Sequence, residues 1–238
     1  MQLLIIFSFF GLWEFLSQKE IISSFIFSSP SLIIKCLLDL HLNNNLWLHI
    51  WTTLKEIFIA FSLGSIIGFT LAIIFYLLPT FKKILDPFLT LINSLPKVSL
   101  GPLLIIWLGA NMSSIIVMSL LINIIVTLIS IYSGLVNTDP YKIKLFRTFK
   151  ASNYQILTKL IIPHNKETFI SSLKLNISMS LIGVIMGEFL VSKAGIGYLI
   201  LYGTQVFNLT LVMTGIILIM IISFILYELI TLLENKNH

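Results

Sequence analysis

The chain has 238 residues, of which 57% are hydrophobic and only 11% are charged, and its mean hydropathy is +1.02. A soluble domain would carry roughly a quarter charged residues, so this composition excludes a water-covered globule and predicts a multi-spanning membrane protein in a lipid bilayer. The net charge of +5 is small, and the single cysteine, Cys36, excludes an intrachain disulfide and a cysteine-based metal site.

The apolar stretches predict an all-α membrane protein with about six transmembrane helices, because a hydrocarbon core about 30 Å thick needs about 20 apolar residues. The first stretch is short and is expected to be a retained helix, since no Lys or Arg precedes it. Residues 1–46 are expected to form this helix and an outer-face connection, and 47–233 the transmembrane domain. The other spans are expected at about 57–78, 94–108, 114–135, 173–190 and 209–233, with a loop over 136–172.

Basic residues in the short loops indicate the orientation of the chain. Ten lie on one side and four on the other, and the side richer in Lys and Arg is normally cytoplasmic. Both termini and the 136–172 loop are therefore expected in the cytoplasm. The ten are Lys82, Lys83, Lys142, Lys144, Arg147, Lys150, Lys159, Lys166, Lys174 and Lys236.

The 136–172 loop is predicted to contain two short helices, over 140–149 and 152–162. Asp139 can cap the first helix and Pro140 fits its first turn. Ser152 and Gln155 form the pattern of a capping box for the second helix, which Pro163 is expected to end. From the residues alone the loop is either an interfacial anchor on anionic lipid or a docking surface for a partner.

Small and polar residues recur on single helix faces in two of the expected spans. Such faces indicate close helix packing, or the lining of a hydrophilic pathway, and both interpretations stay open. A pathway would require a second copy of the chain, because six helices enclose little space. The residues concerned are Ser119, Asn123, Thr127 and Ser130 in the fourth span and Asn176 and Ser180 in the fifth.

Glu188 is an ionisable residue near the outer end of the fifth span, where charge is costly enough to suggest a function. Its carboxyl could hold the 195–200 segment through hydrogen bonds to backbone, or take part in gating. A proton relay would need a second buried acid. None is expected, because Glu14 and Glu228 lie near the ends of their spans.

Several short motifs in this order and spacing resemble the permeases of binding-protein-dependent ABC importers, in the branch for nitrate, sulfonates and taurine. The resemblance covers nearly the whole chain. Its most specific part is Gly-Glu-Phe-Leu at 187–190, which leads into Gly-Ile-Gly-Tyr-Leu-Ile at 195–200. The other parts are Ser-Pro-Ser at 29–31, His-Ile-Trp-Thr-Thr-Leu at 49–54, Leu-Asp-Pro at 85–87, Ser-Leu-Pro at 94–96, and Pro-Leu followed by Trp-Leu-Gly over 102–109.

The resemblance implies the type I importer permease fold, with two short cytoplasmic coupling helices, in a bacterial cell membrane. It implies a non-catalytic subunit without a cofactor or metal of its own. Its partners would be a cytoplasmic ABC ATPase dimer that binds ATP and Mg, an external solute-binding protein and a second permease copy, and no nucleic acid. The substrate would be a small solute resembling a sulfonate, nitrate, taurine or a thiamine precursor.

The family's coupling motif falls on the 136–172 loop, and this chain departs from it. The motif begins with an acid and two alanines, where this chain has Lys144, Leu145 and Phe146. Lys150 replaces the motif's glycine, which would cost roughly 1–2 kcal/mol if that position needs a positive φ. Ala151, Ser152 and Pro163 follow the family pattern. Either the partner ATPase has co-adapted to this loop or coupling is impaired. We favour the first, and so expect the loop to fit one particular ATPase.

Two other classes of protein compete with this reading. An ion-coupled secondary transporter or channel subunit would show inverted repeats, helices broken at mid-membrane and paired buried acids. An intramembrane enzyme would need a nucleophile and base, or a set of metal ligands, on facing helices. The sequence shows none of these patterns.

Overall fold

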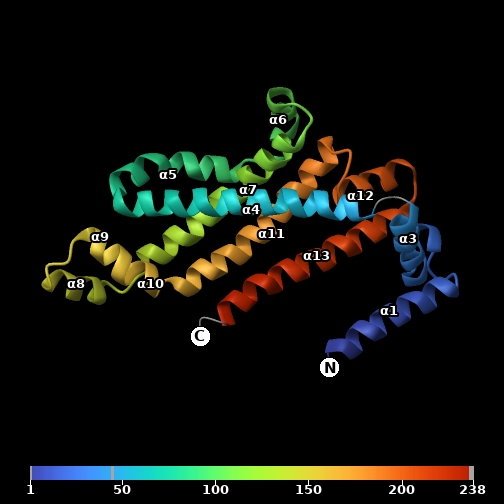
Figure 1. Cartoon of the computed structure of the whole chain (residues 1–238), viewed down its shortest axis with the longest axis horizontal. Helices are drawn as coiled ribbons and strands as arrows, with labels where there is room; N and C mark the ends of the chain where they lie inside the picture. Colours follow the sequence, from blue (N-terminus) through green and yellow to red (C-terminus); the bar gives the residue numbers. More distant parts are fainter. Residues whose placement is uncertain (1, 44–45, 236–238) are drawn as a thin grey trace.

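The computed structural model describes residues 2–43 and 46–235, and every regular element among them is helical, so the predicted all-α fold is confirmed (Figure 1). In chain order the elements are α1 (Gln2–Gln18), α2 (Ser24–Phe27), α3 (Pro30–Asn43), α4 (Leu46–Leu77), α5 (Pro79–Ser94), the 3-10 turn η1 (Lys97–Leu100), α6 (Gly101–Leu108), α7 (Met112–Val136), α8 (Pro140–Thr148), α9 (Asn153–Ile156), the π-helical turn η2 (Leu157–Ile161), α10 (Ile162–His164), α11 (Lys166–Val191), α12 (Ile196–Gln205) and α13 (Leu209–Asn235).

Four of these helices, α4, α7, α11 and α13, are long and apolar enough to cross a membrane. A fifth crossing results if α5 and the segment formed by η1 and α6 count as one span. Helix α1, with 17 residues, is not among them. The described residues therefore supply four or five crossings, where the sequence predicted about six.

Two predicted span boundaries differ from the structure. Helix α4 begins at Leu46, eleven residues before the expected start at Ile57, because the helix continues through Lys55 and Glu56 and exposes only the lysine. The span over 94–108 was expected to be kinked, but the chain breaks at residues 95–96, where α5 and the segment Lys97–Leu108 meet at 86°. Leu95 is extended, with ψ of 137°, as the residue before a proline prefers, and so helix α5 ends at Ser94.

Helices α4, α7 and α11 form the centre of the molecule, where small residues let the backbones approach closely (Figure 1). A Cβ atom on Gly183 of α11 would collide with the backbone of Ser119 on α7. A Cβ atom on Gly64 of α4 would likewise meet the side chain of Asn123 on α7. A larger residue at Gly183 would therefore separate α7 and α11, and one at Gly64 would displace the Asn123 side chain.

The long axis of the molecule has two distinct ends (Figure 1). Helices α8, α9 and α10 lie at one end, which we call the loop end, and α3 and α12 lie at the other, which we call the α12 end. Large apolar side chains such as Phe58, Ile66 and Phe224 remain exposed on the helices between them. Such a surface is compatible with lipid and not with water.

The connection at the loop end is close to the prediction, with one correction. The first helix ends at Thr148, and the second begins at Asn153 after the Ser152 cap. Pro163 was expected to end the second helix, but helical backbone continues to His164. The proline is tolerated because the π-helical turn η2 precedes it, which places it in the first turn of α10.

Candidate functional site

The N-terminus of α12 is held by side chains from two other helices. The first N–H groups of a helix have no partner within it, and the residue before α12, Gly195, has no side chain to cap them. Its own N–H donates to Nδ1 of His49 at 3.1 Å, and that of Ile196 donates to Oγ1 of Thr53 at 2.8 Å. The N–H of Gly197 donates to Oε2 of Glu188 at 2.5 Å. Three consecutive donors are thus satisfied by α4 and α11.

Glu188 is fully buried near the end of α11, and both of its carboxyl oxygens have donors. Oε2 accepts from Gly197, and Oε1 accepts from the hydroxyl of Thr53 at 2.6 Å. Gly195 adopts a φ of +116°, which brings its backbone against this carboxyl, where a Cβ would collide with Oε1. The carboxyl therefore joins α4, α11 and the α12 N-terminus.

Glu56 is a second buried acid, and its burial was not predicted from the sequence. Only 2% of its surface is exposed, and its side chain is in hydrogen-bond contact with Glu188. The expectation of a lone acid in this region was wrong, because a span that begins at Ile57 leaves Glu56 outside it. Glu56 continues the face of α4 on which His49, Thr53 and Ala60 lie, at spacings of three and four. That spacing could have identified it.

A polar hollow of about 410 Å³ adjoins this network at the α12 end. The rings of His49 and Tyr198 stack with centroids 5.9 Å apart, and Tyr198 stacks on Tyr202 at 6.0 Å. Asp39 and Asn208 also line the hollow. The stacked rings continue the contact between α4 and α12 that the backbone hydrogen bonds begin.

A second polar network lies between α4, α7 and α11. Asn123 donates to Oγ of Ser180 at 2.7 Å and to the carbonyl of Ala60 at 3.0 Å. Ser180 in turn donates to Asn176 at 3.0 Å, and Ser119 donates to the carbonyl of Ser180 at 3.0 Å. All of these side chains are fully buried, so the two predicted polar stripes face each other inside one chain.

Two further members of the fourth-span stripe take no part in these contacts between helices. Thr127 is fully buried, and its hydroxyl donates to the carbonyl of Asn123, one turn earlier in the same helix, at 2.8 Å. Its methyl group lies against Gly68 of α4, where a Cβ atom would collide with it. Ser130 is half-buried. The stripe therefore mixes polar contacts with simple close packing.

The loop end carries the predicted coupling residues. Asp139 accepts from the N–H of Tyr141 at 2.8 Å, and both hydrogen bonds of the capping box between Ser152 and Gln155 are present. Lys150 has a φ of +58°, so a non-glycine residue occupies the left-handed turn between α8 and α9. This conformation lets the N–H of Ala151 bond back to Phe146 at 3.1 Å.

The apolar residues of α8 divide between two faces. Tyr141, Leu145 and Phe149 are 79%, 54% and 76% exposed. Phe146, which we expected to face a partner together with Leu145, instead packs against the buried cluster around Leu135. The outward surface of α8 is therefore made by residues spaced four apart. Lys144 is exposed beside them, and Pro163 is exposed on α10.

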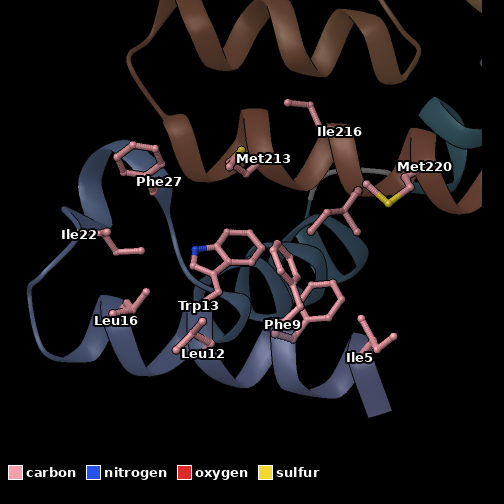
Figure 2. A pocket seen from close by; sticks show the side chains of 12 residues that line it. Ile5, Phe9, Leu12, Trp13, Leu16, Ile22, Phe27, Met213, Ile216 and Met220 are labelled. Carbon is pink, nitrogen blue, oxygen red and sulfur yellow. The ribbon is translucent and has the colours of Figure 1, made fainter. Parts of the chain in front are cut away.

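An apolar hollow of about 670 Å³ lies between α1, α2 and α13 (Figure 2). Figure 2 shows Phe9 and Trp13 of α1 facing Met213 and Ile216 of α13. The described residues that line the hollow are all uncharged. Apart from the indole N–H of Trp13, the described lining offers surface for hydrocarbon.

Residues 60–237 match the family described as binding-protein-dependent transport system inner membrane component. The chain is also 31% identical, over 91% of its length and 87% of the other protein's, to a protein of Haemophilus influenzae named "Probable ABC transporter permease protein". It is 24% identical to a taurine transport system permease protein of Escherichia coli, over 90% of this chain and 80% of the other.

The fold is similar to that of a chain in inward-facing structures of the MetNI methionine ABC transporter. The TM-score is 0.71 at 16% identity, and the match covers 82% of this chain and 98% of the other. In this family ATP is bound by a separate ATPase subunit, so the permease is a non-catalytic, multi-pass protein of the inner membrane. The chain belongs to the binding-protein-dependent transport system inner membrane components, as the permease component of an ABC importer.

Proposed function

We propose that the chain, paired with a second copy, forms the membrane pathway of an ATP-driven importer and receives force from an ATPase dimer at α8. The observation that carries this proposal is the outward face of α8. Tyr141, Leu145 and Phe149 expose three large apolar side chains at helical spacing on a capped helix. A short reversal between α7 and α11 would not need such a surface, whereas a helix that inserts into a groove of a partner would.

The departures from the family's coupling motif define what the partner groove must fit. Leu145 faces outward, so the groove must be wider than one shaped for alanine. The left-handed conformation of Lys150 supports the view that the turn itself is kept although the glycine is absent. We propose that Lys144, Leu145 and Lys150 contact the ATPase, while Phe146, Ala151, Ser152 and Pro163 hold the two helices in position for it.

The distribution of charge supports a cytoplasmic loop end and cytoplasmic termini in a bacterial cell membrane. Lys142, Lys144, Arg147, Lys150 and Lys159 are all exposed on α8, η2 and the turn between them. Positive charge at such density is typical of the cytoplasmic side. Lys236, which we counted on the same side, lies outside the described residues.

The broken span supports the second copy. Leu95 is 51% exposed where α5 ends, and Pro96 and the half-buried Lys97 follow it. Irregular backbone at membrane depth cannot face hydrocarbon, because its freed N–H and C=O groups would have no partners. We infer that this face meets another protein chain or a water-filled pathway. The polar stripes around Asn123 and Ser180 are used within the chain, so we assign them to packing.

The competing class, an ion-coupled secondary transporter or channel subunit, is favoured by two observations and opposed by one. A broken span and a pair of buried acids are both expected of such proteins. The family match is to ABC importers, in which a separate ATPase supplies the energy. We therefore give the two acids a positioning role, developed below.

The name of one relative supports a proposal about the substrate class. The relative from Escherichia coli is named for taurine transport. We propose a small anionic or zwitterionic solute, such as a sulfonate, nitrate or a thiamine precursor, delivered by an external binding protein. Measuring which solute the candidate binding protein captures would test the class directly.

The docking proposal is tested by co-purifying the chain in detergent with its candidate ABC ATPase. Leu145→Asp and Phe149→Asp should each reduce recovery of the ATPase at least tenfold, because a charge would be buried in the groove. Arg147→Asp, exposed on the opposite face of α8 from Leu145, is the matched control and should have little effect. Undiminished co-purification of both Leu145→Asp and Phe149→Asp, or of a chain with residues 144–152 replaced by a Gly/Ser linker, would show that the loop is a lipid anchor.

A further inference from the structure

The buried acids Glu56 and Glu188 form a pair at the contact between α4 and α11. Their exposed fractions are 2% and 0%, and their side chains are in hydrogen-bond contact. Two ionised carboxylates within hydrogen-bond contact would repel each other strongly in a low-dielectric environment. A hydrogen bond between two carboxyl groups also requires a proton on one of them, because an ionised carboxylate can only accept.

The hydrogen bonds around Glu188 show which of the two groups is ionised. Thr53 Oγ1 accepts from the N–H of Ile196, so its own proton is directed to Oε1 of Glu188 at 2.6 Å. The N–H of Gly197 donates to Oε2 of the same carboxyl. Both oxygens of Glu188 accept hydrogen bonds, and these bonds are stronger to an ionised carboxylate than to a neutral carboxyl group. The surroundings of Glu188 therefore favour its ionised form.

Glu56 has the opposite environment. Its Oε2 is buried and has no hydrogen-bond partner among the described residues, and its one polar side-chain contact is with Glu188. Lys55, its neighbour in the chain, is exposed, and His49 uses Nδ1 to accept from Gly195. Neither forms a salt bridge with the pair in the described part of the chain. An ionised Glu56 would be a buried charge without compensation.

We propose that Glu56 and Glu188 hold one proton between them, carried by Glu56, and that Glu56 is thereby a positioning residue for α12. The neutral Glu56 carboxyl donates its O–H to the Glu188 carboxylate. The carboxylate then keeps its remaining lone pairs for Thr53 and Gly197. The attachment of the α12 N-terminus to α4 and α11 depends on this proton, although Glu56 itself does not touch α12.

The first test replaces Glu56 in the full chain reconstituted in lipid nanodiscs and follows amide hydrogen exchange at residues 195–197. Glu56→Gln keeps a donor to Glu188 and should leave exchange unchanged within about twofold. Glu56→Ala removes the donor and should speed exchange about tenfold or more, which is the change for about 1.4 kcal/mol. Glu188→Gln should also speed it, because an amide NH₂ would face Thr53 or Gly197. Equal acceleration by Glu56→Gln and Glu56→Ala would overturn the proposal.

The second test does not depend on the folding of any damaged variant. Infrared spectroscopy of the reconstituted wild-type chain at neutral pH should show the C=O stretch of a protonated carboxyl group that Glu56→Gln lacks. Glu14→Gln, at an acid near the surface, is the matched control and should keep the band. Absence of the band from the wild type would show that both acids are ionised around a bound cation. Persistence of the band in Glu56→Gln would place the proton elsewhere, and either result refutes the assignment.

Discussion

Thr53 on α4 donates its hydroxyl proton to Glu188 on α11 over 2.6 Å, and its oxygen also accepts from the N–H of Ile196. One side chain thus joins three helices at the α12 end. Neighbouring residues repeat the arrangement, since His49 and Glu188 accept from Gly195 and Gly197. The position of α12 is therefore set by polar contacts that come from outside its own sequence segment.

Thr53→Val should destabilise the chain, because the substitution keeps the shape of the side chain and removes both hydrogen bonds. Leaving Ile196 N–H without a partner and Glu188 with one donor fewer should cost about 1–3 kcal/mol of unfolding free energy. Thermal unfolding in nanodiscs measures the change. Thr52→Val is the matched control, since that hydroxyl bonds only to the carbonyl of Leu48 in its own helix. A loss no larger than that of Thr52→Val would contradict the proposed importance of this contact.

Gly195→Ala should be more damaging than its size suggests. The φ of +116° is unfavourable for any residue with a side chain, and the new Cβ would collide with the Glu188 carboxyl. We expect a loss of about 2–4 kcal/mol. The control is Gly11→Ala on α1, where nothing lies within 4 Å of the new Cβ and alanine favours the helix. Equal melting temperatures for the two variants would show that the α12 N-terminus is not held as described.

Lys150→Gly should stabilise the turn between α8 and α9. Lysine at a φ of +58° costs about 1–2 kcal/mol, and glycine avoids this cost while losing about 0.5–1 kcal/mol through a more flexible unfolded chain. Amide exchange at Ala151, whose N–H bonds to Phe146, should therefore slow modestly. Lys142→Gly, inside α8, is the opposing control and should speed exchange there. Faster exchange in Lys150→Gly would mean that the lysine side chain stabilises the turn.

Asn123→Cys should remain unlabelled by a water-soluble maleimide if the polar stripe of α7 serves packing. The experiment uses a Cys36→Ser background, since Cys36 is the single cysteine of the chain. Asn123 is fully buried against α4 and α11, so the reagent should not reach it in the folded protein. Thr204→Cys, exposed on α12, is the positive control. Labelling of both cysteines at similar rates would assign the stripe to a water-filled pathway.

Local patterns were sufficient to predict the structure wherever the determining contacts are close in sequence. Asp139 and the pair Ser152 and Gln155 cap their helices as expected, because a cap depends on only three or four consecutive residues. The polar stripe of α7 was also found, since helical spacing alone defines a face. What lies opposite that face was not predictable, because it depends on how α4 and α11 pack together.

Glu56 shows why part of the site was missed. In a hydropathy profile the two charged residues Lys55 and Glu56 together mark the end of a span. On a helix, however, successive side chains point about 100° apart. The lysine is exposed and the acid is buried. The break at Pro96 was missed for a related reason. Composition could show that the segment is apolar, yet the direction of the chain after the proline depends on what packs against α6.

Helix α11 is a single unbroken rod that joins the two ends of the molecule. It starts directly after Asn165, whose side-chain amide donates to the hydroxyl of Thr138 at 2.7 Å and so joins the two ends of the loop. Glu188 lies three residues before the other end of the helix. Its 26 residues span about 39 Å at 1.5 Å per residue. If a movement of α8 tilted α11, Glu188 at the opposite end of α11 would therefore be displaced. The N-terminus of α12 would move directly with it, because Gly197 is hydrogen-bonded to Glu188.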